Sequence, residues 1–192
     1  MGEIIGGTVG FLLYFVYDIN SIKWKNSFLQ KFFAIGSVCV ICSTVWALVE
    51  NISEDIMHSV IGIILGAVSL GFLGLLVYTL FFALPFNETY LHESKERIAY
   101  TEGVYSLCRH PGVLWFAGAY LCFAGMSGTL RSSLYFILMI FWNFLYVVFQ
   151  DFLIFPATFI NYEKYKGNTP FIFPNRRSVN MFLLWKRDRK RS

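Results

Sequence analysis

The sequence predicts an all-α polytopic membrane protein, and three observations carry that prediction. Of the 192 residues, 56% are hydrophobic and only 15% are charged, a composition that is unusual for a soluble globular protein. Long charge-free stretches recur, each near or above the roughly 20 residues that cross a bilayer. Basic residues gather in alternate connections between these stretches. We therefore expect residues 1–192 to form a single integral membrane domain.

Five charge-free stretches predict about five transmembrane helices, of which the first is the weakest. That first stretch lacks the basic flank and cleavage pattern of a signal peptide, so we expect it to stay in the mature protein. Pro85 is expected to end the third helix, which is long enough to require tilting. The stretches are Ile4–Tyr17, Phe32–Val49, Val60–Phe86, Gly112–Leu130 and Ser132–Phe149.

The orientation follows from the loops, because Lys and Arg stay on the cytoplasmic side. Apart from Arg131, every basic residue follows the first, third or fifth span. This alternation predicts an N-terminus outside the cell or in a lumen, and a cytoplasmic C-terminus. The basic residues before the fifth span are Lys23, Lys25 and Lys31, then Lys95, Arg97 and Arg109.

Small residues, cysteines and histidines indicate packing and no metal chemistry. Gly62 and Gly66, and then Ala67 and Gly71, are four residues apart, a spacing of small residues that lets another helix approach the third span closely. Cys39 and Cys42 lie in an apolar stretch, where packing is a commoner role than redox chemistry. The three histidines are scattered without carboxylates at ligand-like intervals, so we expect no metal site.

The segment GVYSLCRHP, Gly103–Pro111, places an Arg-His-Pro triplet where a basic loop enters an apolar span. Asp151 is the acid nearest the end of the fifth span, and a carboxylate in the bilayer needs either the interface or a cationic partner. Arg109 is the obvious partner. On these two residues alone, a structural ion pair and a ligand site are both open.

Aromatic residues and prolines follow Asp151. Phe159, Tyr162 and Tyr165 are three apart, which fits one stripe of an amphipathic interfacial helix or an aromatic belt at the membrane surface. Pro170 and Pro174 then indicate an extended exit.

Together the two segments resemble the isoprenylcysteine carboxyl methyltransferase and phospholipid N-methyltransferase superfamily. The first matching block is Gly103–Pro111, and the similarity spans residues 103–174. The chain differs from the family pattern at Val113, where an aromatic is usual, at Gln150, where the first acid of an acidic pair is usual, and at Ile160, where a glycine is usual. The second block matches at Gln150, Asp151, Phe159, Tyr162, Tyr165, Thr169, Pro170 and Pro174.

The resemblance implies S-adenosylmethionine-dependent methyl transfer to a lipidic, lipidated or otherwise hydrophobic acceptor at the cytoplasmic face. It implies catalytic roles for Arg109 and His110, with Arg109 on the carboxylate of the cofactor and His110 as a hydrogen-bond partner or base. Pro111 is expected to start the fourth helix. The implied cofactor-binding residues are Tyr105, Arg109, His110, Pro111, Gln150, Asp151, Tyr162 and Tyr165.

The tail of residues 175–192 ends in a basic cluster, Lys186–Arg191, directly after an apolar patch. Attraction to anionic headgroups supplies about 1 kcal/mol per basic residue near a membrane. We expect this tail to bind membrane lipids and not nucleic acid.

Two other functional classes stay open. Membrane sterol and steroid reductases use a similar Arg-His-Pro loop, which makes an NADPH-dependent reductase the first alternative. The second is a non-enzymatic transporter subunit or scaffold, in which Arg109 and Asp151 form a structural pair.

Overall fold

The computed structural model describes residues 1–52, 54–83 and 97–189. The described residues are helical with short connections and contain no strand, which confirms the predicted all-α class. The elements are α1 (Gly2–Ile22), α2 (Ser27–Gln30), α3 (Phe32–Asn51), α4 (Glu54–Met57), α5 (Val60–Val77), the π-helical turn η1 (Tyr78–Phe82), the 3-10 turn η2 (Gly103–Ser106), α7 (Pro111–Met126), α8 (Leu130–Phe149), the π-helical turn η3 (Gln150–Ile154), α9 (Phe155–Thr158), α10 (Tyr162–Asn168) and α11 (Arg176–Arg189).

Within the described residues, four helices are long and apolar enough to cross a membrane: Gly2–Ile22, Ser27–Glu50, Val60–Phe82 and Leu130–Thr158. The first of these has the lowest mean hydropathy of the four, 1.3, as expected for the weakest span, although its helix has 21 residues and continues beyond Tyr17 through Asp18. The predicted fourth span is the shorter apolar helix α7, with 16 residues. A fifth crossing at α7 therefore stays a prediction, and Pro85 lies outside the described residues.

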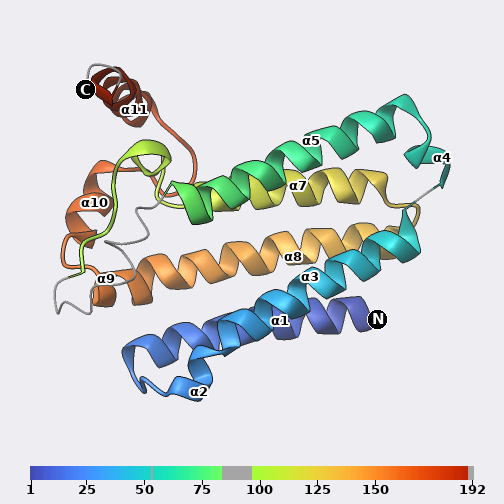
Figure 1. The fold of residues 1–192 in the computed structure, drawn as a ribbon, viewed down its shortest axis with the longest axis horizontal. Helices are drawn as coiled ribbons and strands as arrows, with labels where there is room; N and C mark the ends of the chain where they lie inside the picture. Colours follow the sequence, from blue (N-terminus) through green and yellow to red (C-terminus); the bar gives the residue numbers. More distant parts are fainter. Residues whose placement is uncertain (53, 84–96, 190–192) are drawn as a thin grey trace.

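Long helices that follow one another in the chain run antiparallel where they pack together (Figure 1). α1 packs along α3, α5 along α7, and α7 along α8, while α8 also contacts α1. The backbones of α1 and α3 approach each other closely at two glycines, where a Cβ on Gly10 would lie 2.8 Å from the carbonyl oxygen of Gly36. Small residues at such a crossing let the two backbones approach directly.

The glycine pattern predicted in the third span does not have the expected role. A Cβ on Gly71 would meet nothing within 4 Å, and one on Gly66 would only touch the Met126 side chain at 4.0 Å. Gly62 instead accommodates the carbonyl of Ile56 in the tight connection from α4. The four-residue spacing was therefore a misleading signal, because it describes one helix face and not what covers that face.

The main buried cluster is largely aromatic and lies between α1, α3, α7 and α8. Phe116 and Tyr120 stack at 3.9 Å, and Phe11 lies edge-on to Phe116. The buried hydroxyls of Tyr120 and Tyr135 both lie within hydrogen-bonding distance of the Thr44 hydroxyl, at 2.7 and 3.1 Å. These hydrogen bonds offset the cost of burying hydroxyl groups in an apolar bundle.

Side chains on the outer face of α5 are apolar and exposed, including Val60 at 74% and Leu70 at 69%. A soluble protein rarely exposes a continuous surface of this kind, whereas lipid tails cover it at no cost. This face supports the assignment of α5 as a membrane span.

Segments from distant parts of the chain meet at one end of the molecule. α2, α9, α10 and α11 lie at that end, while the N-terminus and α4 lie at the other (Figure 1). The first end carries Lys23, Lys25, Arg109 and the tail, as the basic-loop alternation predicts. At the opposite end Arg131 pairs with Glu3 at 2.8 Å. The two segments that resemble the methyltransferase superfamily therefore lie at the same end of the bundle.

Candidate functional site

The Arg-His-Pro loop is shaped by its glycine and by main-chain pairing. Gly103 has a φ of +59°, a left-handed conformation that favours glycine, and it opens the turn η2. The amide N–H groups of Arg109 and His110 donate to the carbonyls of Pro170 and Phe171 at 2.9 and 3.2 Å. Two segments about sixty residues apart are thus joined directly before α7 begins.

Pro111 occupies the first turn of α7, as expected from its position after the loop. Proline is suited to this place because its missing N–H has no helical partner there and its φ already matches the helix. Its role is therefore structural, and it fixes the direction in which the chain leaves His110.

Asp151 reaches the loop from a π-helical turn. η3 continues α8 without a break, and its wider turn changes the directions of successive side chains. Gln150 donates from Nε2 to Oδ2 of Asp18 in α1 at 2.9 Å, whereas Asp151 faces the Arg-His-Pro loop. The adjacent residues Gln150 and Asp151, predicted to act as a pair, therefore contact different parts of the protein.

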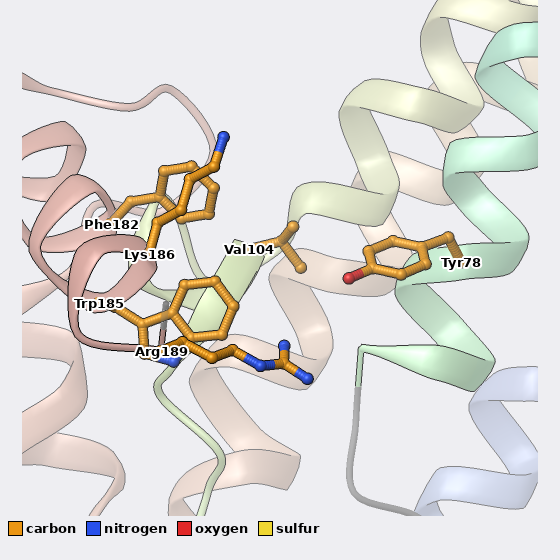
Figure 2. A pocket seen from close by; sticks show the side chains of 6 residues that line it. All are labelled: Tyr78, Val104, Phe182, Trp185, Lys186 and Arg189. Atoms are coloured by element: carbon orange, nitrogen blue, oxygen red, sulfur yellow. The ribbon is translucent and has the colours of Figure 1, made fainter. Parts of the chain in front are cut away.

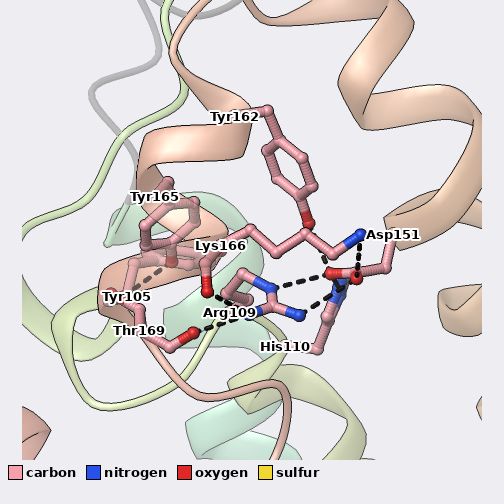
Figure 3. Close-up of polar contacts among 8 residues, drawn as sticks. All are labelled: Tyr105, Arg109, His110, Asp151, Tyr162, Tyr165, Lys166 and Thr169. Atoms are coloured by element: carbon pink, nitrogen blue, oxygen red, sulfur yellow. Dashed lines mark hydrogen bonds and ion pairs between the residues drawn. The ribbon is translucent and has the colours of Figure 1, made fainter.

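Asp151 lies at the centre of a buried polar cluster (Figure 3). Arg109 donates to it through Nε and Nη2 at 2.8 and 3.0 Å, so the predicted pairing of these residues is confirmed. Oδ1 of Asp151 also lies 3.0 Å from Nε2 of His110 and accepts a 2.6 Å hydrogen bond from Tyr162. Nζ of Lys166 is 4.0 Å from Oδ2.

The rest of the Arg109 guanidinium binds the end of α10. Nη1 donates to the carbonyl of Thr169 at 2.6 Å and to that of Lys166 at 3.2 Å. Carbonyls at a helix C-terminus lack partners in the helix and carry partial negative charge, so a cation is favourable there. Arg109 also lies over the Phe171 ring, 5.5 Å from its centroid.

Burial and neighbouring charges set the protonation states of this cluster. Burial lowers the pKa of His110 and outweighs the opposing attraction of Asp151, so the imidazole is neutral near pH 7. Burial lowers the pKa of Arg109, but the hydrogen bonds and charge of Asp151 raise it more, and the guanidinium stays charged. Burial raises the pKa of Tyr162, whose hydroxyl therefore remains a donor.

A neutral His110 beside an ionised carboxylate has a defined tautomer. Nε2 must carry the hydrogen in order to donate to Asp151, which leaves a lone pair on Nδ1. Phe155 stacks on the ring at 5.7 Å and Phe171 meets it edge-on at 5.1 Å. His110 is therefore held in one orientation with a basic nitrogen, which is the arrangement of a general base.

Tyr105 and Tyr165 form a separate hydrogen-bonded chain next to this cluster. Tyr165 donates to the carbonyl of Tyr105 at 2.7 Å, and Tyr105 donates to the carbonyl of Thr79 at 3.0 Å. Burial raises the pKa of Tyr165, so it too acts as a donor. Both hydroxyls connect the loop to the surrounding helices.

Cys108, beside Arg109, is a buried thiol. Burial raises its pKa to about 11, against the lowering effects of the His110 backbone and the Arg109 charge. The thiolate is the reactive form of cysteine, so Cys108 is inert as a nucleophile near neutral pH.

The structure thus brings four predicted site residues into direct contact, Arg109, His110, Asp151 and Tyr162, and turns Gln150 away from them. The expected aromatic stripe needs correction, because Phe159 precedes α10 in an extended conformation and only Tyr162 and Tyr165 lie on that helix. Across residues 1–52, 54–83 and 97–189, no group of side chains is suited to hold a metal ion.

Sequence reasoning missed Lys166, the Thr169 carbonyl and Asp18. Lys166 lies four residues after Tyr162 on α10, a spacing that puts both on one helical face. Asp18 is a carboxylate at the end of an apolar stretch, which is itself a signal for a partner. No sequence signal exists for the Thr169 carbonyl, because every residue has one.

Comparison of the chain with protein-family models, with curated proteins and with solved structures finds no match in any of the three. The resemblance to a methyltransferase superfamily therefore rests on the two blocks of residues described above.

Proposed function

We propose that this protein transfers a methyl group from S-adenosylmethionine to a hydrophobic acceptor at the membrane surface. One observation carries the proposal: the two blocks that resemble the methyltransferase superfamily converge in one buried cluster, with Arg109 and His110 from the first block and Asp151 and Tyr162 from the second. Polar groups are costly to bury at the end of a membrane bundle, and such clusters concentrate at functional sites.

The donors and acceptors of this cluster fit a cofactor only in part. A guanidinium has five N–H groups, and Asp151, Thr169 and Lys166 use four of those of Arg109. At most one remains, so a cofactor carboxylate can form the expected paired contact only by displacing Asp151. Asp151 in turn has its oxygens occupied by Arg109, His110 and Tyr162.

Because the hydrogen-bonding groups of Arg109 and Asp151 are nearly all occupied, we assign these two residues and His110 roles that differ from those implied by the resemblance. Arg109 and Asp151 act as positioning residues that join the loop, η3 and the end of α10. His110 is the candidate for contact with a ligand, because Asp151 orients its ring and leaves Nδ1 available as a base.

The cofactor supplies an activated methyl group, and the residues supply orientation and proton transfer. With an amine or thiol acceptor, Nδ1 of His110 accepts the proton that the nucleophile loses. With a carboxylate acceptor no base is needed. The acceptor class therefore predicts whether His110 contributes to turnover or only to binding.

Equilibrium binding of S-adenosylmethionine and, separately, NADPH to the detergent-purified full chain tests the proposal. We expect saturable S-adenosylmethionine binding that weakens about tenfold in His110→Gln, the loss of one hydrogen bond to a buried polar group. The matched control is His58→Gln, since His58 is exposed and directly follows α4, which lies at the other end of the molecule (Figure 1). It should bind as the unmodified protein does.

Binding of NADPH alone would replace the proposal by the reductase alternative. A non-enzymatic scaffold is the second candidate, and one specific observation favours it: the Arg109–Asp151 pair already satisfies nearly all of its own hydrogen-bonding groups. Absence of binding by both cofactors to a folded protein would support that candidate and overturn the proposal.

A further inference from the structure

A second site lies on the other side of the Arg-His-Pro loop, between α11 and the end of the third candidate span. Six side chains line a cavity of about 470 Å³: Tyr78, Val104, Phe182, Trp185, Lys186 and Arg189. In Figure 2 Tyr78 and Val104 face the aromatic and basic side chains of α11 across this cavity. None of the candidate cofactor-binding residues contributes to its walls.

The aromatic wall of the cavity is held in place by the loop. Trp185 donates from Nε1 to the Glu102 carboxylate at 3.2 Å. Its ring also approaches Gly103, where a Cβ would lie 3.6 Å from two ring carbons. Phe182 stacks on Trp185 with ring centroids 5.8 Å apart. The wall is therefore prearranged and loses little side-chain entropy when a ligand binds.

The rim of the cavity is basic, in contrast to its aromatic wall. Lys186 and Arg189 are both exposed, and the Arg189 guanidinium lies over the Trp185 ring at 5.4 Å. No acidic side chain is among the six that line the cavity. The carboxylate of Glu102 accepts the Trp185 hydrogen bond, and Asp188 on α11 lies 3.7 Å, Oδ1 to Nε, from Arg187. The rim therefore favours an anion.

An exposed apolar surface lies next to the cavity, at the end of a candidate membrane span. Tyr78 begins the turn η1 at the end of the candidate span Val60–Phe82, and it is 45% exposed. Phe81 and Phe82 in the same turn are 54% and 73% exposed. A ligand with an anionic head at Lys186 and Arg189 can thus continue into the membrane along an apolar surface.

We propose that this cavity binds the headgroup of one anionic phospholipid, with its phosphate at Lys186 and Arg189 and its glycerol region against Tyr78 and Trp185. This site goes beyond the proposed methyl transfer and does not depend on it. It also differs from diffuse attraction of the basic tail to a membrane, because it assigns binding to particular side chains with a stoichiometry of one.

The tail provides a matched control for this distinction. Arg187 follows Lys186 on α11 and is also exposed, but it does not line the cavity. Its Nε lies 3.7 Å from Oδ1 of Asp188. Lys186→Ala and Arg187→Ala remove the same charge from adjacent positions. Diffuse attraction predicts equal effects, and a defined cavity predicts a loss in the first variant only.

Native mass spectrometry of the full chain, titrated in detergent with dioctanoyl phosphatidylglycerol, tests the proposal. We expect a single adduct whose dissociation constant rises about fivefold in Lys186→Ala, the equivalent of one basic contact near a headgroup. Trp185→Ala should weaken it similarly, and Arg187→Ala should leave it unchanged. Dioctanoyl phosphatidylcholine, which has no net charge, should bind more weakly.

Three results would overturn the proposal. An equal loss in Arg187→Ala would assign the binding to the charge of the tail as a whole. Glycerol 3-phosphate binding as tightly as the lipid would assign the cavity to a soluble phosphate. Absence of a specific adduct in the folded protein, with helix content verified by circular dichroism, would exclude a lipid site.

Discussion

The hydroxyl of Tyr162 donates a 2.6 Å hydrogen bond to Oδ1 of Asp151, eleven residues earlier in the chain. Both side chains are almost completely buried, with exposures of 2% and 0%. This contact connects α10 to the π-helical turn and completes the set of donors around the carboxylate.

Removal of that hydroxyl should destabilise the fold measurably. In Tyr162→Phe we expect the free energy of unfolding to fall by about 1.5–3 kcal/mol, the usual contribution of a hydrogen bond to a charged group. Chemical unfolding in detergent measures it. Tyr78→Phe is the control, since that side chain is 45% exposed and should change stability by less than about 0.5 kcal/mol. Equal effects in both variants would contradict the assigned role of Tyr162.

A double-mutant cycle should find strong coupling between Arg109 and Asp151. We expect Arg109→Met or Asp151→Leu alone to cost about 3–5 kcal/mol, because either leaves a buried charge without its partner. The double variant should cost much less than the sum. Arg131→Met, which breaks a pair with a 55% exposed arginine, should cost about 0–1 kcal/mol. Additive single effects would show that the pair is not a unit.

Acid should weaken the protein through His110. Its pKa in the folded state is below the ordinary value of about 6.5, so below that pH the unfolded chain binds more protons than the folded one. The contribution of neutral His110 to the free energy of unfolding is therefore complete above about pH 6.5. It is lost as the pH falls, by no more than about 1.4 kcal/mol per pH unit.

Thermal melts of the unmodified protein and His110→Gln between pH 5 and 8 test this dependence. The difference between the two isolates His110 from the other groups that titrate, including the carboxylates. We expect the unmodified protein to lose more stability in acid than the variant. Parallel curves would mean that His110 does not change protonation on unfolding.

The sidedness of the loops can decide whether α7 crosses the membrane. If it does, the loop at Asp55 and the helix at Arg187 lie on opposite sides; if it does not, they lie on the same side. Single cysteines, Asp55→Cys and Arg187→Cys in a cysteine-free background, should react with an impermeant maleimide from opposite faces of sealed vesicles. We expect Asp55→Cys to react from the outside or lumen.

Hydropathy and charge determined the helical class, four of the spans and the pairing of Arg109 with Asp151. These properties are carried by the side chains themselves, because the cost of placing a residue in lipid depends mainly on its own chemistry. A lone intramembrane carboxylate needs a cation, and few were available at the same end of the bundle.

Only the tertiary structure decided what else surrounds that pair. The π-helical turn directs Gln150 to Asp18 and Asp151 to the loop, although adjacent residues carry no sequence sign of this division. The carbonyls of Lys166 and Thr169 occupy Arg109, and α11 completes a cavity beside Gly103. Such contacts depend on backbone groups that every residue shares and on the approach of distant segments, which no local pattern encodes.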